Sequence, residues 1–226
     1  MADGPEQFAD QPDARKLLDS RTVYEGRIWD VVTDTFSLSG SGDDVLVRDY
    51  IAHPGAVAVL AMDGRGRVLL LKQYRQPARM SLWEIPAGLL DVEGEDFAAA
   101  AARELAEEAD LTAARWDVLA DFFNSPGSSS EAIRIYLARE LTDVPEDQRH
   151  VRTDEEAEIE HRWVSLEEAV AAVLGGRLHN PSAVVGILAA AEAARTGFSG
   201  LRPADAPWPE HPSQRHTWGT PGQNGA

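Results

Sequence analysis

Three glutamates on one predicted helix are the residues whose types and spacing could do chemistry in this chain. Glu104, Glu107 and Glu108 occur at i, i+3 and i+4 within "FAAAAARELAEEADL" (97–111), so they share one face of a helix. Two carboxylates one turn apart can chelate a hard cation, and Mg²⁺ favours such ligands because it keeps waters and also binds phosphate oxygens. A metal held there would bind a diphosphate and lower the pKa of an attacking water. The alternative is a solvated acidic surface, since "RELAEE" alone is common on exposed helices.

The rest of this segment predicts a helix with one buried face. Phe97, Ala101 and Leu105 lie along another side at helical spacing, which indicates an apolar stripe that packs on a core. Arg103 precedes Glu107 by four residues, the spacing at which opposite charges on a helix can pair. We therefore expect the arginine to brace the acidic face.

The elements that must position this helix are mostly strands before it and helices late in the chain. Strands are predicted from β-branched and aromatic content over 22–38, 45–51, 55–62, 68–75, 82–86, 116–123, 132–140 and 159–164. Helices are predicted over 165–176, with Ser165 as N-cap, and over 181–195. The acidic stretch 142–158 is expected to be a long loop. This order predicts an α/β protein with a mixed sheet packed between helices.

Charge and composition exclude several classes of function. The chain has 21 basic and 38 acidic residues and a formal net charge of −17, which repels nucleic acid and anionic membranes. It has no cysteine, so disulfides, thiolate metal sites and cysteine nucleophiles are excluded. No apolar run reaches the roughly 20 residues that cross a bilayer, and the acidic N-terminus is unlike a signal peptide. We expect a cytoplasmic protein that binds neither nucleic acid nor membrane.

A longer pattern around the acidic helix resembles the Nudix box, G-x5-E-x7-R-E-U-x-E-E-x-G-U, in which U is apolar. "IPAG" ends at Gly88, and Glu95 is followed by seven residues before Arg103. The later places are filled by Glu104, Leu105, Glu107, Glu108 and Leu111. There are two departures: six residues instead of five separate Gly88 from Glu95, and Asp110 replaces the last glycine. The insertion falls in a loop, and aspartate tolerates the left-handed conformation of a helix end better than most residues.

The resemblance implies a Nudix-type α/β/α sandwich with a mixed sheet, here with a small N-terminal antiparallel sheet. It also implies hydrolysis of a nucleoside diphosphate linked to another group, with Mg²⁺ as cofactor and Mn²⁺ as a possible substitute. The positions that match the family's metal ligands are the Ala87 carbonyl oxygen, Glu104, Glu107 and Glu108. Glu95 and Arg103 are expected to brace the loop and the helix.

Outside the box the chain resembles the ADP-ribose pyrophosphatase branch of this family. Pro126 of "SPG" lies fifteen residues beyond Leu111, where that branch carries a proline, and with Gly127 it would line the substrate site. A plain β-turn explains the same two residues, because proline and glycine are turn residues anyway.

The resemblance to this branch also implies a homodimer that exchanges its N-terminal sheet. Arg48 would then reach the partner's phosphates and Arg75 those of its own subunit, since the arginine fork binds phosphate oxygens in pairs. Either arginine could equally belong to a surface ion pair. Tyr24 and Trp29 are candidates for stacking on adenine, although strand aromatics are more often part of a core.

The general base of such an enzyme is expected on the loop before the strand that precedes the first late helix. Counting back from "WVS" in "TDEEAEIEHRWVS" indicates Glu155, with Glu156 as the second candidate and Glu107 of the box as the third. The base would take a proton from the attacking water. An acidic loop in an acidic protein needs no such purpose, which is the competing interpretation.

These predictions divide the chain into four parts and leave three functions open. We expect a flexible leader (1–18), a dimer-forming N-terminal sheet (19–54), a hydrolase domain (55–197) and a proline-rich tail or arm (198–226). The first function is hydrolysis of ADP-ribose to AMP and ribose 5-phosphate. The second is the same hydrolysis of another nucleoside diphosphate, in which a different group takes the place of the ribose 5-phosphate half, as in a nucleotide-sugar or dinucleotide pyrophosphatase. The third is a non-catalytic sensor that binds ADP-ribose, against which the intact glutamates argue.

Overall fold

The computed structural model describes residues 9–40, 44–152 and 159–214. Its helices are α1 (Phe97–Ala109), α2 (Leu166–Leu174) and α3 (Pro181–Arg195), with a short 3₁₀ turn η1 (Glu146–Gln148). The strands are β1 (Lys16–Tyr24), β2 (Asp30–Ser37), β3 (Val45–Ala52), β4 (Ala56–Ala61), β5 (Arg67–Arg75), β6 (Met80–Glu84), β7 (Ala87–Leu89), β8 (Leu111–Phe123), β9 (Ala132–Asp143), β10 (Glu160–Ser165) and β11 (Arg202–Pro203). They form sheets with the orders β1-β2-β3, β10-β5-β6 and β11-β8-β9-β4-β7.

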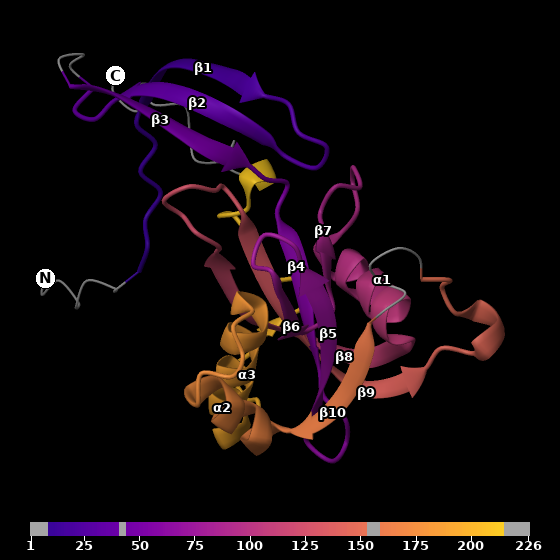
Figure 1. Cartoon of the computed structure of the whole chain (residues 1–226). Coiled ribbons are helices and arrows are strands. Elements are labelled where there is room, and N and C mark those ends of the chain that lie inside the picture. The colour runs from indigo at the N-terminus through magenta and orange to yellow at the C-terminus, as the bar shows by residue number, and fades with distance from the viewer. Residues whose placement is uncertain (1–8, 41–43, 153–158, 215–226) are drawn as a thin grey trace, which may run out of the picture.

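The sheets of the main body lie between α1 on one side and α2 with α3 on the other (Figure 1). Every residue of β4 is buried, and its side chains alternate between two cores. Ala58 and Leu60 belong to the core that also contains residues of α3. Val57 and Val59 belong to the core that α1 covers. A strand covered on both faces reads as a continuous apolar run, and this arrangement is the predicted α/β/α sandwich.

The sequence predictions for the two late helices are confirmed. The Ser165 hydroxyl accepts the Glu168 N–H at 3.1 Å at the start of α2. The Asn180 side chain accepts the Ala183 N–H at 2.9 Å at the start of α3, where Pro181 is the first helical residue. None of the helices in the described ranges is long and apolar enough to span a membrane.

The N-terminal sheet differs from the prediction in its strand limits. The single strand predicted over 22–38 is two strands, β1 and β2, and β1 already begins at Lys16, inside the segment expected to be a flexible leader. The chain turns tightly between them at Gly26, where a Cβ atom would lie 2.1 Å from the Trp29 carbonyl oxygen. The Gly26 N–H also donates to the Asp30 carboxylate at 3.1 Å. The glycine is the one sequence signal for this turn.

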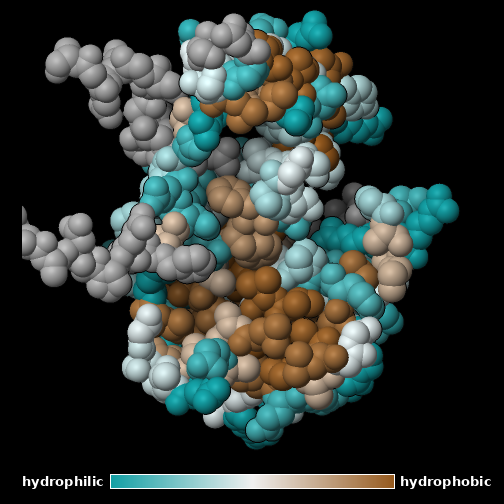
Figure 2. Space-filling view, turned by 90° about the vertical axis from the view of Figure 1, so that its left-hand side faces the viewer, coloured by the Kyte–Doolittle hydropathy of each residue, from teal (hydrophilic) through white to brown (hydrophobic). Residues whose placement is uncertain are grey.

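The N-terminal sheet stands at one end of the main body and is poorly covered (Figure 1). Every residue of β1 is exposed. Figure 2 shows apolar surface on this sheet at the top of the view. In the part of the chain that the structure describes, the exposed large apolar side chains of this sheet are Leu17, Leu18, Val23, Tyr24, Val45 and Val47. A sheet of this kind needs a further surface to pack on.

The proline-rich segment beyond residue 197, predicted to be a tail or arm, packs against the main body as far as it is described. The β11 strand pairs with β8, and Trp208 is only 3% exposed. Its ring lies 5.1 Å from the Phe97 ring and 4.7 Å below the Arg134 guanidinium. The sequence did not predict this packing, because the segment is rich in prolines and has no periodic apolar pattern. A few large side chains hold it in place instead.

Candidate active site

The acidic helix follows β7 and the loop that begins at Leu90. The Asp96 carboxylate caps α1 by accepting the N–H groups of Ala98 and Ala99 at 2.9 and 3.2 Å, which satisfies two of the unpaired donors at a helix start. Ala101 and Leu105 are fully buried, as the predicted apolar stripe requires. Glu108 is buried on the same side of α1 as Ala101 and Leu105.

Arg103 joins the glutamates of this region into one network. Its Nε and Nη2 atoms donate to the two oxygens of Glu95, each at 3.0 Å, and its Nη1 donates to Glu104 at 2.6 Å and Glu107 at 3.1 Å. The hydrogen bond from Arg103 lowers the pKa of Glu95, and its bonds to Glu95 raise the pKa of Arg103 in turn. The predicted bracing of loop and helix by Glu95 and Arg103 is confirmed.

Two of the glutamates contact the backbone of β7 directly. The Glu108 carboxylate is buried and accepts the Ala87 N–H at 2.9 Å. The Glu104 carboxylate lies so close to Gly88 that a Cβ atom there would meet its carboxyl carbon at 2.0 Å. Position 88 therefore requires glycine, because any Cβ atom there would clash with the Glu104 carboxylate. The Gly88 backbone itself is not in the left-handed region. The helix and the strand together place two carboxylates beside the Ala87–Gly88 backbone.

That backbone lines a cavity of about 580 Å³. Trp29 and Arg75 line the same cavity, so two of the predicted substrate residues share a cavity with the β7 backbone that Glu104 and Glu108 contact. Arg75 forms a fork with Glu84, with Nε and Nη2 donating to its two oxygens at 2.9 and 2.8 Å. The Glu84 side chain is 4% exposed and that of Arg75 is 42% exposed, so a buried carboxylate orients an arginine that reaches solvent.

Three other predicted substrate residues line a neighbouring cavity of about 910 Å³, whereas Tyr24, the second stacking candidate, lines neither of these two cavities. Arg48, Pro126 and Gly127 lie there, and His53 borders both cavities. The Arg48 guanidinium bonds only the carbonyl oxygen of Val47 among the hydrogen bonds of the described residues, at 2.8 Å. Within one chain, therefore, Arg48 and Arg75 do not line the same cavity. Glu155 and Glu156, the candidate bases, lie outside the described residues.

The comparison with protein families decides which family this arrangement represents. The family model described as "NUDIX domain" matches residues 52–182, which include β4 to β10 and the acidic helix. The chain belongs to the Nudix family. Enzymes of this family generally use divalent metal ions.

Named relatives resemble the chain over most of its length. It is 40% identical over 198 residues to an ADP-ribose pyrophosphatase of Mycobacterium tuberculosis (strain ATCC 25618 / H37Rv), covering 88% of this chain and 93% of the relative. It is 35% identical over 155 residues to an ADP-ribose pyrophosphatase of Bacillus subtilis (strain 168), covering 69% and 80%. A methanol dehydrogenase activator of Bacillus methanolicus is 30% identical over 172 residues, covering 76% and 90%.

A solved structure supports the Nudix fold independently. The crystal structure of an ADP compounds hydrolase superposes with a TM-score of 0.68 at 18% sequence identity, covering 84% of this chain and 98% of that chain. At this identity the likeness establishes the fold alone. It agrees with the layered arrangement of sheets and helices described above.

The donors of the Nudix box fit a hard divalent cation by their chemistry. Glu104 and Glu108 of α1 contact the backbone of Gly88 and Ala87, and carboxylate oxygen is the kind of ligand that Mg²⁺ and Mn²⁺ prefer. Among the residues that the structure describes, no three His, Cys, Asp or Glu side chains are gathered closely enough to hold a metal ion. Arg103 bonds one oxygen of Glu104 and one oxygen of Glu107, so these two carboxylates already share one cation.

Sequence reasoning missed the polar residues that join the two cavities. The His53 side chain is 7% exposed and lies between the Trp29 ring, at 5.6 Å between centroids, and the Glu131 carboxylate at 3.6 Å. Asn124 donates to the same glutamate at 2.7 Å. Burial lowers the pKa of His53, although Glu131 opposes this. Histidine spacing could not reveal this contact, because it depends on the pairing of distant strands and loops.

Proposed function

We propose that this chain hydrolyses the diphosphate bond of ADP-ribose to AMP and ribose 5-phosphate. The observation that carries the proposal is the contact of Glu104 and Glu108 with Gly88 and Ala87, at the wall of a cavity that Arg75 also lines. It supports a site in which metal-binding carboxylates and a phosphate-binding arginine act together. The names of the two pyrophosphatase relatives, at 40% and 35% identity, support the choice of ADP-ribose.

We assign Mg²⁺, with Mn²⁺ as a substitute, to the Ala87 carbonyl oxygen, Glu104, Glu107 and Glu108. The bound metal would offset the negative charge of the diphosphate and activate water for attack on phosphorus. Arg103 keeps Glu95 as a partner through two separate nitrogens, so it can release Glu104 and still hold the loop. Without a bound cation, the negative charge of the glutamates on α1 would repel an anionic substrate.

Arg75 is proposed to bind the substrate phosphate in its own subunit. Its Nε and Nη2 form the fork to Glu84, and the side chain lines the cavity that the β7 backbone also lines. The buried carboxylate thus fixes the direction of the guanidinium at the cavity wall. This is the arrangement by which a second group pre-orients a phosphate-binding arginine.

The N-terminal sheet is proposed to be exchanged between two subunits of a homodimer. Its exposed apolar side chains require a covering surface, and Arg48 does not reach the cavity of Arg75 within one chain. In a two-fold dimer, Arg48 of one subunit would contact the phosphates in the other.

Trp29, which is 41% exposed in the cavity wall, is proposed to stack on adenine. A cytoplasmic location stays a prediction.

Glu155 is proposed as the general base, with Glu156 and Glu107 as the other candidates. The base takes a proton from water as the water oxygen bonds to phosphorus and the bridging P–O bond breaks. The segment that carries Glu155 and Glu156 leaves the described chain at Arg152, whose side chain contacts the end of α1. That contact supports a base near the carboxylate helix.

A substrate panel tests the proposal. Wild-type protein with Mg²⁺ is given ADP-ribose, ADP-glucose, UDP-glucose and a dinucleoside diphosphate, and kcat/KM is measured for each by chromatography of the products. We expect ADP-ribose to give the highest value and chelation of the metal to stop turnover. A higher kcat/KM for a nucleotide sugar or a dinucleotide would make that compound the preferred substrate and leave the proposed hydrolysis of a diphosphate bond unchanged. Binding of ADP-ribose without turnover of any compound would favour a non-catalytic sensor.

A further inference from the structure

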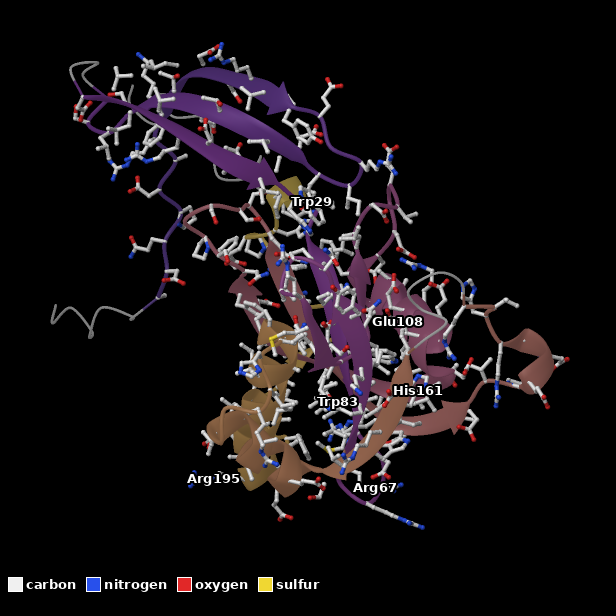
Figure 3. The ribbon with its side chains drawn as sticks, in the orientation of Figure 1. Trp29, Arg67, Trp83, Glu108, His161 and Arg195 are labelled. Atoms are coloured by element: carbon white, nitrogen blue, oxygen red, sulfur yellow. The ribbon has the colours of Figure 1, made fainter. Side chains whose placement is uncertain are left out.

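The helix α3 begins at the cavity of about 580 Å³ described above. Pro181 and Ser182, the first two residues of the helix, belong to the cavity wall. Figure 3 shows Trp29, another residue of this wall, beneath the N-terminal sheet, and it shows Arg195, the last residue of α3, at the opposite end of the main body. The amino end of α3 therefore faces the cavity.

Close packing of α3 on the sheets holds this helix start in place. Ala183 and Ile187 are fully buried. A Cβ atom at Gly186 would meet side-chain atoms of Ile85 and Ile135 at 3.4 and 3.5 Å, so the glycine lets the helix approach the strands closely. A close-packed interior leaves little room for such a helix to shift. The first turn of α3 therefore keeps one position in the cavity wall.

Most N–H groups of this first turn already have partners or are absent. Pro181 has no N–H. The Asn180 side chain accepts the Ala183 N–H at 2.9 Å, and the Asn180 carbonyl accepts the Val184 N–H at 3.0 Å. Among the residues that the structure describes, the Ser182 N–H has no hydrogen-bond partner. Such a donor at a buried helix start is satisfied by water or by a ligand.

The Ser182 side chain adds a second donor at the same place. Ser182 is only 7% exposed, yet its hydroxyl makes no hydrogen bond within the described ranges 9–40, 44–152 and 159–214. Most buried polar side-chain atoms have a partner, and a residue of a cavity wall can find one inside the cavity. One residue thus offers an N–H and an O–H group to whatever binds there.

The charges around these two donors favour an anion. The amino end of a helix carries a partial positive charge, and phosphate groups bind at such ends. Arg75 lines the same cavity. Both carboxylates of the described wall are already engaged, since Glu84 binds Arg75 and Glu131 accepts a hydrogen bond from Asn124 at 2.7 Å. The start of α3 and the arginine thus form the positive part of this cavity.

We propose that Ser182 binds a phosphate oxygen of the substrate, with its backbone N–H and its hydroxyl as the two donors. Ser182 would then contact the diphosphate from α3, in the cavity whose wall also contains Arg75 and the β7 backbone. Donors fixed in place before the substrate binds hold negative charge without reorganisation. The inference deepens the proposed function and rests on it for the choice of a diphosphate as ligand.

The test measures binding of inorganic diphosphate, which carries neither sugar nor base. Ser182→Ala removes the hydroxyl and keeps the backbone N–H, and alanine is the residue most favourable to a helix, so the variant should fold. Calorimetry at a constant Mg²⁺ concentration gives the Kd of diphosphate. We expect this Kd to rise about 10-fold, the effect of losing one hydrogen bond to a charged group. Melting curves check that the variant is as stable as the wild type.

A second variant tests the charge of the site. Ser182→Asp adds a negative charge that repels an anion, so the Kd of diphosphate should rise more than in Ser182→Ala. Ser199→Ala and Ser199→Asp are the matched controls, because Ser199 is exposed and lines neither of the two cavities described above. Both controls should bind diphosphate as the wild type does. A loss in Ser182→Asp no larger than that in Ser182→Ala would contradict the assigned charge.

An unchanged Kd of diphosphate in Ser182→Ala would overturn the inference, as would a wild type that binds no diphosphate. If KM for the hydrolysed compound rises in Ser182→Ala while the Kd of diphosphate does not, the hydroxyl contacts the sugar or the base, and the assignment to phosphate is wrong. Binding of diphosphate requires no turnover. A wild type that is inactive on ADP-ribose therefore counts against the proposed substrate and not against the role of Ser182.

Discussion

Replacing Gly88 by alanine tests the geometry of the carboxylate site without removing any of its groups. The new Cβ atom would lie 2.0 Å from the Glu104 carboxyl carbon, whereas ordinary contact begins at 3.4 Å. The carboxylate must therefore move by at least about 3.4 − 2.0 = 1.4 Å. A displacement of about 1 Å at a reacting site can cost about 100-fold in rate, so we expect kcat to fall by about 100-fold. The apparent affinity for Mg²⁺ should fall with it.

The same change should leave the fold nearly intact. The clashing atoms are the end of a flexible side chain, and the Gly88 backbone is not in the left-handed region. Replacing glycine by alanine at a compatible position stabilises a protein by about 0.4–1 kcal/mol through the unfolded chain, which offsets the cost of moving Glu104. Gly64→Ala is the matched control, because nothing lies within 4 Å of its Cβ position. Wild-type kcat and Mg²⁺ response in Gly88→Ala would refute the assignment of Glu104 to the metal.

Three further predictions concern the base, the dimer and a buried histidine. Glu155→Gln should lower kcat by about 100-fold with little change in substrate binding; if only Glu156→Gln does so, the assignment is off by one residue. Mixing Arg48→Ala and Glu104→Gln chains should restore activity in part, because one hybrid site carries neither change, and a monomer by light scattering would contradict this. Since burial lowers the pKa of His53, its contribution to stability is complete above its ordinary pKa of about 6.5 and is lost as the pH falls through the lower folded value. Urea unfolding should therefore show a steeper loss of stability below about pH 6.5 in wild type than in His53→Asn.

The fold class and the helices could be predicted because their signals are local. The "AVAVLA" run of β4, the Ser165 cap and the Gly88-to-Glu108 spacing all lie within short stretches. The predicted stripe of α1 and the bracing by Arg103 follow from the helical period alone. Identity of the family followed from the same stretch.

What could not be predicted depends on contacts between residues far apart in the sequence. Trp208 packs on Phe97 and Arg134, and nothing near Trp208 in the sequence indicates a core position among prolines. Asp110 was noted as a departure from the box, but its partner Arg152 lies 42 residues away. The start of β1 at Lys16 was also not predicted. Every residue of β1 is exposed, so the strand lacks the alternation of apolar and polar residues that burial of one face imposes.

The most direct test of the central claim is to follow ADP-ribose by ³¹P NMR with wild type, Glu104→Gln and Glu108→Gln at saturating Mg²⁺. Removing one carboxylate charge leaves a side-chain oxygen that can still accept a hydrogen bond, so both variants should stay folded, as should an exposed control, Glu192→Gln. We predict equal amounts of AMP and ribose 5-phosphate from wild type and from Glu192→Gln, and no products from the two α1 variants. Unchanged ADP-ribose in the wild-type sample, or near-normal product formation by both α1 variants, would contradict the account.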